Sequence, residues 1–245
     1  MNIFRKRANL SWVLYSELAK RENPAERVGR PVRAYDSEGL VLDEILRITS
    51  FQERRSILDI GCGCGNLAIK LAEIAQRNNQ DLTLLDIEPV INKLESNMSE
   101  PLLASSKRIH GIFPTKLDAP LGSYDLIVAY SVMHYVDSPT NFILHACKLL
   151  QKGGMIFIGD IPNLDKRIRF NKGNSYSLLS RAGIRQLYSK SVLSDNFSDR
   201  KLMKLVRKLR CLGFDAYLYP QHRNLPHSGS REDLVVTFAR NTANL

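Results

Sequence analysis

Apolar and polar residues alternate through the middle of the chain in two distinct patterns. Segments near residues 66–77, 90–98 and 142–150 have the spacing of amphipathic helices. Between them stand short, mainly apolar runs that predict strands, at Ser56–Ile60, Leu82–Asp86, Arg108–Phe113, Tyr124–Tyr130 and Met155–Gly159. Strands that alternate with helices are typical of a parallel sheet covered on both faces, so we expect an α/β fold.

The pattern changes after the fifth strand. Residues 163–197 combine Asn, Gly and Ser with short apolar pieces, which predicts an irregular, lid-like insertion. A helix follows, with Ser198 as its cap and apolar residues at i, i+3, i+4 and i+7 from Leu202. Two last strands, Ala216–Tyr219 and Leu234–Ala239, are joined by a loop and must be antiparallel. The complete pattern predicts a Rossmann-like sheet of seven strands, five parallel plus a terminal antiparallel pair.

The remaining features set the domain organisation and the compartment. Residues 1–50 precede the sheet and include an amphipathic helix at Glu38–Ile48, so they are expected to form a helical cap on a domain spanning residues 51–245. No run approaches the roughly 20 apolar residues of a transmembrane helix. The four cysteines have neither zinc-site nor disulfide-framework spacing, which favours a reduced, cytoplasmic protein without a metal site.

A glycine-rich loop after the first strand carries the strongest chemical signal. Such a turn brings the backbone N–H groups at the start of a helix close to a ligand. Dinucleotide-binding domains use Gly-x-Gly-x-x-Gly, whereas Gly61, Gly63 and Gly65 form Gly-x-Gly-x-Gly. Asp59, inside the strand, would repel a pyrophosphate and attract a cationic ligand.

The run Leu58-Asp59-Ile60-Gly61-Cys62-Gly63-Cys64-Gly65 resembles the first motif of class I S-adenosylmethionine (SAM)-dependent methyltransferases. Residues 123–134 resemble the fourth motif, and the resemblance extends over about residues 55–162. It implies SAM as cofactor, with Asp86 binding both ribose hydroxyls and Ile87 packing on the adenine. The loop contacts that it implies are Asp59, Gly61, Cys62, Gly63 and Gly65.

Two positions depart from the family pattern. Cys64 stands where Thr or Ser is frequent, and Ile112-Phe113 stand where an acidic residue often meets the adenine. Phe113 is therefore a candidate for apolar contact with the adenine. Tyr130, at the end of the fourth strand, and Tyr35, before the first helix, are further cofactor candidates.

Candidates for catalysis lie past the carboxyl ends of the strands, where such sheets bind ligands. His134 follows the fourth strand and is a candidate general base, since an unperturbed His has a pKa of about 6.5; alternatively it only shapes the pocket. Asp160 ends the fifth strand and either binds a substrate hydroxyl, orients His134 or caps the loop. His222, Arg223 and His227, in the last loop, are candidate substrate contacts.

The net charge of +10 is concentrated in one segment, because residues 163–211 contain 13 Lys and Arg but 3 Asp and Glu. Such an excess indicates either an anionic partner or a solvated helix face. Our leading hypothesis is methyl transfer to oxygen of a small or glycan-like acceptor, such as a phosphorylated or nucleotide-linked sugar. Its phosphate would meet Lys166, Arg167 and Arg169. The alternatives are RNA or protein methylation, and an inactive SAM-binding scaffold.

Overall fold

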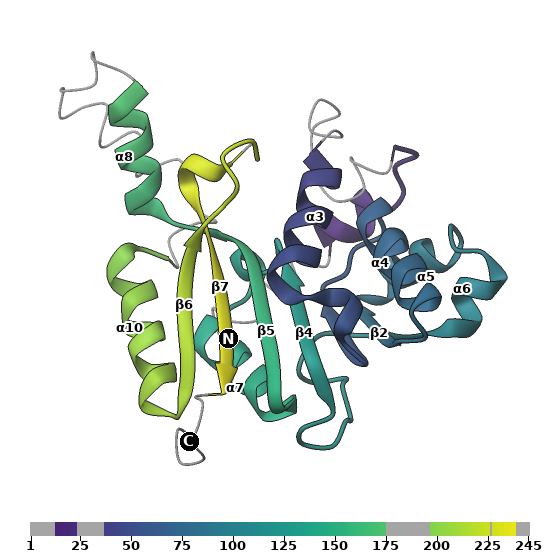
Figure 1. The fold of residues 1–245 in the computed structure, drawn as a ribbon. Helices are drawn as coiled ribbons and strands as arrows, with labels where there is room; N and C mark the ends of the chain where they lie inside the picture. Colours follow the sequence, from purple (N-terminus) through teal and green to yellow (C-terminus); the bar gives the residue numbers. More distant parts are fainter. Residues whose placement is uncertain (1–12, 24–36, 175–196, 226, 239–245) are drawn as a thin grey trace, which may run out of the picture.

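A single mixed sheet forms the centre of the molecule (Figure 1). The computed structural model describes residues 13–23, 37–174, 197–225 and 227–238. The strand order is β3-β2-β1-β4-β5-β7-β6; β1 to β5 are parallel, and β7 is antiparallel to both of its neighbours. This confirms the predicted Rossmann-like sheet. The strands are β1 (Ser56–Ile60), β2 (Asp81–Asp86), β3 (Ser106–His110), β4 (Tyr124–Tyr130), β5 (Leu150–Pro162), β6 (Phe214–Pro220) and β7 (Arg231–Phe238).

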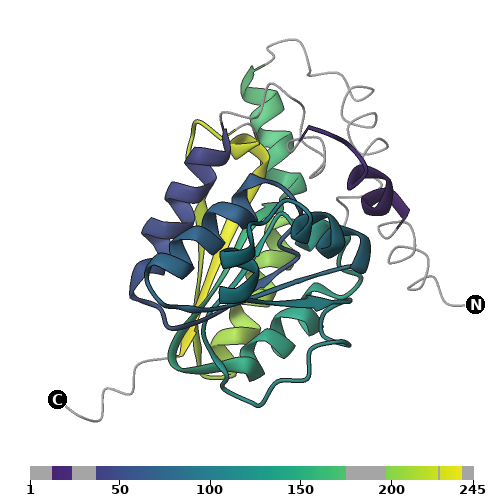
Figure 2. The same cartoon turned by 90° about the vertical axis from the view of Figure 1, so that its right-hand side faces the viewer.

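Helices cover both faces of this sheet (Figures 1 and 2). One buried cluster joins the sheet to α3, α4 and α5, and a second joins it to α7 and α10. The helices are α3 (Ser37–Thr49), α4 (Asn66–Arg77), α5 (Glu88–Glu95), α6 (Glu100–Ser105), α7 (Pro139–Leu149), α8 (Leu164–Asn174) and α10 (Asp199–Cys211). The strand order reverses between β1 and β4, which is where open α/β sheets bind their ligands.

The predicted cap and apolar stripe of α10 are confirmed. Ser198 Oγ accepts a hydrogen bond from the backbone N–H of Lys201 (3.3 Å). The apolar stripe is buried, and the basic side chains occupy the exposed face. Among the described residues, no helix combines the length and the apolar character that crossing a bilayer requires.

Several sequence-based boundaries are wrong. The third strand was expected at Arg108–Phe113, but β3 spans Ser106–His110, so Phe113 follows the strand. The fifth strand was expected at Met155–Gly159, but β5 already begins at Leu150, so Lys152-Gly153-Gly154 lies inside it. The pairing of β4 with β5 jumps from Tyr124↔Leu150 to Leu126↔Met155, so the extra residues form a bulge, and Gly153 supplies a φ of 78°. The expected irregular insertion begins instead with the helix α8; residues 175–196 of that prediction lie outside the described part.

Candidate active site

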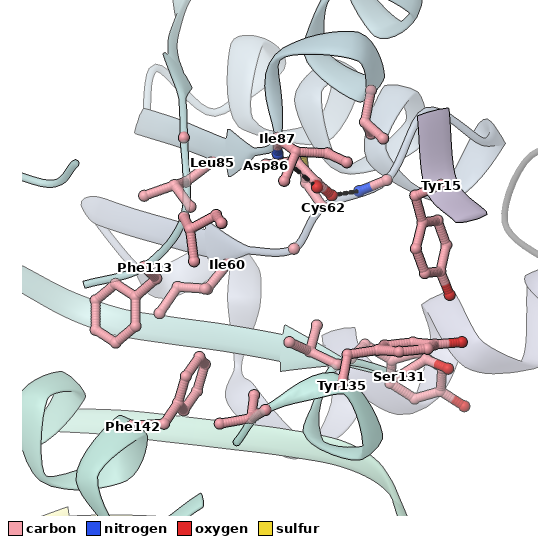
Figure 3. Close-up of a pocket in the computed structure, with 18 of the residues that line it drawn as sticks. Tyr15, Ile60, Cys62, Leu85, Asp86, Ile87, Phe113, Ser131, Tyr135 and Phe142 are labelled. Carbon is pink, nitrogen blue, oxygen red and sulfur yellow. Dashed lines mark hydrogen bonds between the residues drawn. The ribbon is translucent and has the colours of Figure 1, made fainter. Parts of the chain in front are cut away.

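A cavity of about 360 Å³ opens at the carboxyl ends of β1, β2 and β4 (Figure 3). This volume is typical of small-molecule sites. Phe113 and Phe142 pack edge to face at one end, with ring centroids 4.9 Å apart. Tyr15 lies at the other end, and the glycine loop forms part of the wall between them. The cavity therefore has an aromatic end and a more polar end.

The glycine loop depends on glycine at Gly61. Its φ is +70°, and its N–H donates to the carbonyl of Leu85 (2.7 Å). A Cβ at this position would lie 2.5 Å from Cγ2 of Val132. Only glycine therefore suits both the backbone conformation and the space available. The loop exposes four of the expected contacts to the cavity, namely Gly61, Cys62, Gly63 and Gly65.

Asp86 is held in place by the backbone around it. Its two carboxylate oxygens accept from the N–H of Gly63 (2.9 Å) and from the N–H of Ile87 (2.7 Å), as Figure 3 shows. Burial raises the pKa of Asp86 to about 6, and these two hydrogen bonds oppose the rise. A carboxylate offers about four lone-pair sites, so sites remain for further donors. Asp86 can thus accept hydrogen bonds from a ligand without leaving the loop.

Asp59 lies in β1 as expected, but its side chain does not reach the cavity. It is buried and is not among the residues that line the cavity. Burial, and then the charge of Asp86, raises its pKa to about 7. Burial also raises the pKa of the neighbouring Cys62 thiol, which is therefore a neutral part of the wall. Asp59 therefore lies behind the glycine loop, outside the lining of the cavity.

Ser131 and Asp160 form the most organised polar contact beside the cavity. Ser131 follows β4 and lines the cavity, and its Oγ donates to Oδ2 of Asp160 (2.7 Å). Oδ1 of Asp160 lies 3.5 Å from Nε of Arg231. The backbone N–H of Asp160 donates to Oδ1 of Asp233 (2.9 Å), which also accepts from Gln221 (3.1 Å). Asp160 is therefore fixed from three directions, behind Ser131.

Two tyrosines define the polar end of the cavity. Tyr15, from the helical segment 13–18, meets Tyr135 edge to face, with ring centroids 4.9 Å apart. Burial raises the pKa of Tyr135, and a hydrogen bond with Tyr15 acts in the opposite direction. Both phenols line the cavity (Figure 3). Sequence analysis missed Ser131, Tyr15 and Tyr135, and also His145, which lines the cavity from α7.

His134 lies next to this end but does not line the cavity. It belongs to the 3-10 turn η3 (Met133–Tyr135), and its ring lies 3.9 Å from that of Tyr135, centroid to centroid. Its Nδ1 is buried and has no hydrogen-bond partner among the described residues. Burial lowers its pKa to about 4; Arg231 also lowers it, and Asp160 raises it. The imidazole is therefore neutral at pH 7.

The other predicted residues divide between the cavity and its surroundings. Ile87, Phe113 and Tyr130 line it, whereas Tyr35 lies outside the described residues. His222 and Arg223 do not line it; Nδ1 of His222 accepts from the backbone N–H of Asn224 (3.4 Å). His227 lines a separate cavity.

The basic residues at the start of α8 are not equivalent. Lys166 binds Glu232 (3.2 Å) and the carbonyl of Arg231 (2.6 Å). Arg169 forms an ion pair with Asp199. Of the three expected phosphate contacts, Arg167 lines the same separate cavity as His227, whereas Lys166 and Arg169 line neither of these two cavities.

Comparison with known proteins agrees with this geometry. A family model described as "Methyltransferase domain" matches residues 33–202. The ubiquinone biosynthesis O-methyltransferase of Xanthomonas euvesicatoria is 26% identical over 106 residues, which are 43% of this chain and 42% of that protein. The ubiquinone biosynthesis O-methyltransferase of Sodalis glossinidius is 27% identical over 125 residues, which are 50% of this chain and 47% of that protein. The chain thus spans about half the length of these curated relatives.

Solved structures share the fold. The plantazolicin methyltransferase BpumL, in complex with a monoazolic desmethylPZN analogue and SAH, gives a TM-score of 0.64 at 17% identity and covers 97% of this chain and 96% of its own. Phosphoethanolamine N-methyltransferase 1 of Haemonchus contortus gives a TM-score of 0.70 at 15% identity. The match covers 100% of this chain and 51% of that one. With its glycine loop and sheet order, the chain belongs to the methyltransferase-domain family, as a class I methyltransferase whose methyl donor is SAM.

Proposed function

We propose that the protein transfers the methyl group of SAM to an oxygen atom of a small or glycan-like acceptor. The observation that carries this proposal is the Ser131–Asp160 hydrogen bond at the wall of the cavity. A hydroxyl nucleophile must lose its proton when it attacks the methyl carbon, so a proton acceptor helps. The names of the curated relatives, which are O-methyltransferases, also favour oxygen.

The aromatic half of the cavity suits the nucleoside of the cofactor. In this proposal Ile87 and Phe113 pack on the adenine, and Asp86 accepts hydrogen bonds from the ribose hydroxyls. The backbone of Gly61 to Gly63 approaches the amino-acid portion, helped by the negative charge of Asp59 behind it. These contacts hold the donor in one orientation, which is the main contribution that a protein makes to an in-line displacement.

The polar half suits the acceptor. Oγ of Ser131 accepts the proton of the acceptor hydroxyl while its own proton moves to Oδ2 of Asp160. Nε of Arg231 lies 3.5 Å from the other oxygen of Asp160, Oδ1, and helps to hold the carboxylate in place. His134 does not take part in this step, because it does not line the cavity and lacks a hydrogen bond to Asp160 among the described contacts. Tyr15 and Tyr135 orient the acceptor.

The test is a screen with SAM labelled in its methyl group. The full chain is incubated with hydroxyl-bearing small molecules, including phenols and sugars, and in parallel with RNA and with protein extract. Asp86→Ala serves as the negative control. We expect label in a small product, as an ether, that the control does not form. Label found only in RNA or protein would contradict the proposal and favour RNA or protein methylation. Label in no acceptor, while SAM still binds, would contradict it and favour an inactive SAM-binding scaffold.

A further inference from the structure

A second cavity of about 350 Å³ lies between α8 and the connection from β6 to β7. Figure 1 shows these two segments side by side at one end of the sheet, and α8 contacts the 3-10 turn η4 (Ser228–Ser230) of that connection. The volume is in the range of small-molecule sites. None of the roles assigned above uses this cavity as a binding site.

The chemistry of this cavity is cationic. Arg167, His227 and Arg231 line it together with Ser230, and no lining residue in the described part is acidic. No ion pair within the described residues involves Arg167. Arg231 binds Asp160 through Nε, whereas its Nη1 is buried and has no hydrogen-bond partner among the described atoms. Within the described part of the chain, the guanidinium of Arg167 therefore supplies unpaired donors at the lining, and Arg231 has one unpaired nitrogen.

Side chains rather than the start of α8 must supply the donors. Asn163 caps this helix, because its Oδ1 accepts from the N–H of Asp165 (3.1 Å) and of Lys166 (3.2 Å). The N–H of Leu164 donates to the carbonyl of Phe197 (3.2 Å). Two arginines in one cavity suit an oxyanion with several acceptor oxygens, and phosphate matches the guanidinium fork.

The second cavity is linked to the first by three side chains. Arg231 lines the second cavity and contacts Asp160, which accepts from Ser131 in the wall of the first. We propose that the second cavity binds the phosphate group of the acceptor, so that the acceptor lies across Arg231 with its hydroxyl at Ser131. This inference rests on the proposed function. The volume exceeds the needs of one phosphate and leaves room for part of the group that carries it.

The test measures binding of inorganic phosphate to the full chain at constant ionic strength. Arg167→Gln removes one lining guanidinium. Arg200→Gln makes the same change of charge on the exposed face of α10 and is the matched control. We expect Arg167→Gln to bind phosphate about tenfold more weakly, the usual loss for a charge-assisted hydrogen bond. Wild type and Arg200→Gln should bind equally, and SAM affinity should be the same in all three proteins.

Equal loss in the two variants, or no binding by the wild type, would overturn the inference. Kinetic measurements then distinguish two explanations of phosphate binding: that the site holds the phosphate group of the acceptor, or that it holds a separate regulatory ion. Inorganic phosphate should compete with a phosphorylated acceptor, and Arg167→Gln should raise KM for that acceptor but not for its unphosphorylated form. Non-competitive inhibition would contradict the inference. If unphosphorylated hydroxyls are methylated but phosphate does not bind, the proposed function stands and this inference fails.

Discussion

Ser131 donates a 2.7 Å hydrogen bond to Asp160 from a backbone conformation that both residues share, with φ at 61° in each. A positive φ is uncommon for residues other than glycine, and such strain concentrates at functional sites. Ser131 directly follows β4, whereas Asp160 lies within the neighbouring strand β5, whose pairing with β7 is irregular between Ile158 and Ile161. The irregular backbone turns the carboxylate of Asp160 toward the end of β4.

If Ser131 and Asp160 act as one unit, their substitutions should not add. Asp160→Asn and Ser131→Gly both suit a left-handed backbone while removing the proton relay. Each should lower kcat about 100-fold, within the usual range for general base catalysis. The double variant should lose little more than either single one. Losses of kcat that add in the double variant would show that Ser131 and Asp160 do not act as one unit. A change in the Kd for SAM would show that the substitutions affect cofactor binding instead of the proton transfer.

SAM affinity should fall in acid. Burial raises the pKa of Asp86 to about 6, so below that pH the free protein carries a neutral carboxyl that has lost acceptor capacity. Linkage predicts binding about tenfold weaker at pH 5 than at pH 8. Asp59, with a pKa raised to about 7, changes affinity in the same direction. Titration calorimetry of Asp86→Asn should show only the pH dependence of SAM affinity that is due to Asp59. The same pH profile in wild type and variant would contradict a role for the Asp86 carboxylate in SAM binding.

Gly61→Ala should damage both folding and binding. The added Cβ would approach Cγ2 of Val132 at 2.5 Å and would impose a φ of +70° on alanine. We expect a loss of about 1–3 kcal/mol in the free energy of unfolding, with much weaker SAM binding. Gly39→Ala is the control, because Gly39 lies in α3 and a Cβ added there would meet no atom within 4 Å. Denaturant unfolding that shows equal stability for the two variants would contradict the close approach at Gly61.

His134 should contribute stability that is lost in acid. Its folded-state pKa is lowered to about 4 from the ordinary 6.5, so the unfolded chain binds the proton more readily. This contribution is complete above pH 6.5 and declines as the pH falls toward 4, by about 2 kcal/mol at pH 5. The raised pKa values of Asp59, Asp86 and Asp233 act in the opposite sense. The difference between wild type and His134→Asn isolates the histidine, and equal pH dependence in both proteins would refute its low pKa.

The half of the cavity that we propose for the cofactor was predictable because its chemistry is local in sequence. Gly61 and Gly63 stand in a turn that directly follows a strand, and Asp86 ends the next strand. The strand ends therefore bring them together without any detail of packing. Asp59 was placed in the correct strand, but the hydrophobic pattern did not reveal that its side chain would be buried beside the loop.

The half of the cavity that we propose for the acceptor was not predictable to the same degree. Asp160 meets Ser131 through an irregular strand. His134 and Tyr135 both lie in the 3-10 turn η3, and of the two only Tyr135 lines the cavity. Neither feature has a periodic signal in the sequence. The ion pairs at the start of α8 also have no periodic signal in the sequence, because Lys166 and Arg169 pair with residues far along the chain.

The most direct test of the account is calorimetric titration of SAM into wild-type protein and into Asp86→Ala. Asp86 lines the cavity and is fixed by the N–H groups of Gly63 and Ile87, so its carboxylate is the expected partner of the ribose hydroxyls. We expect binding to the wild type and an affinity at least about tenfold lower for Asp86→Ala, the usual effect of losing a hydrogen bond to a charged group. Equal affinity for the two proteins would contradict the assignment of this cavity to SAM.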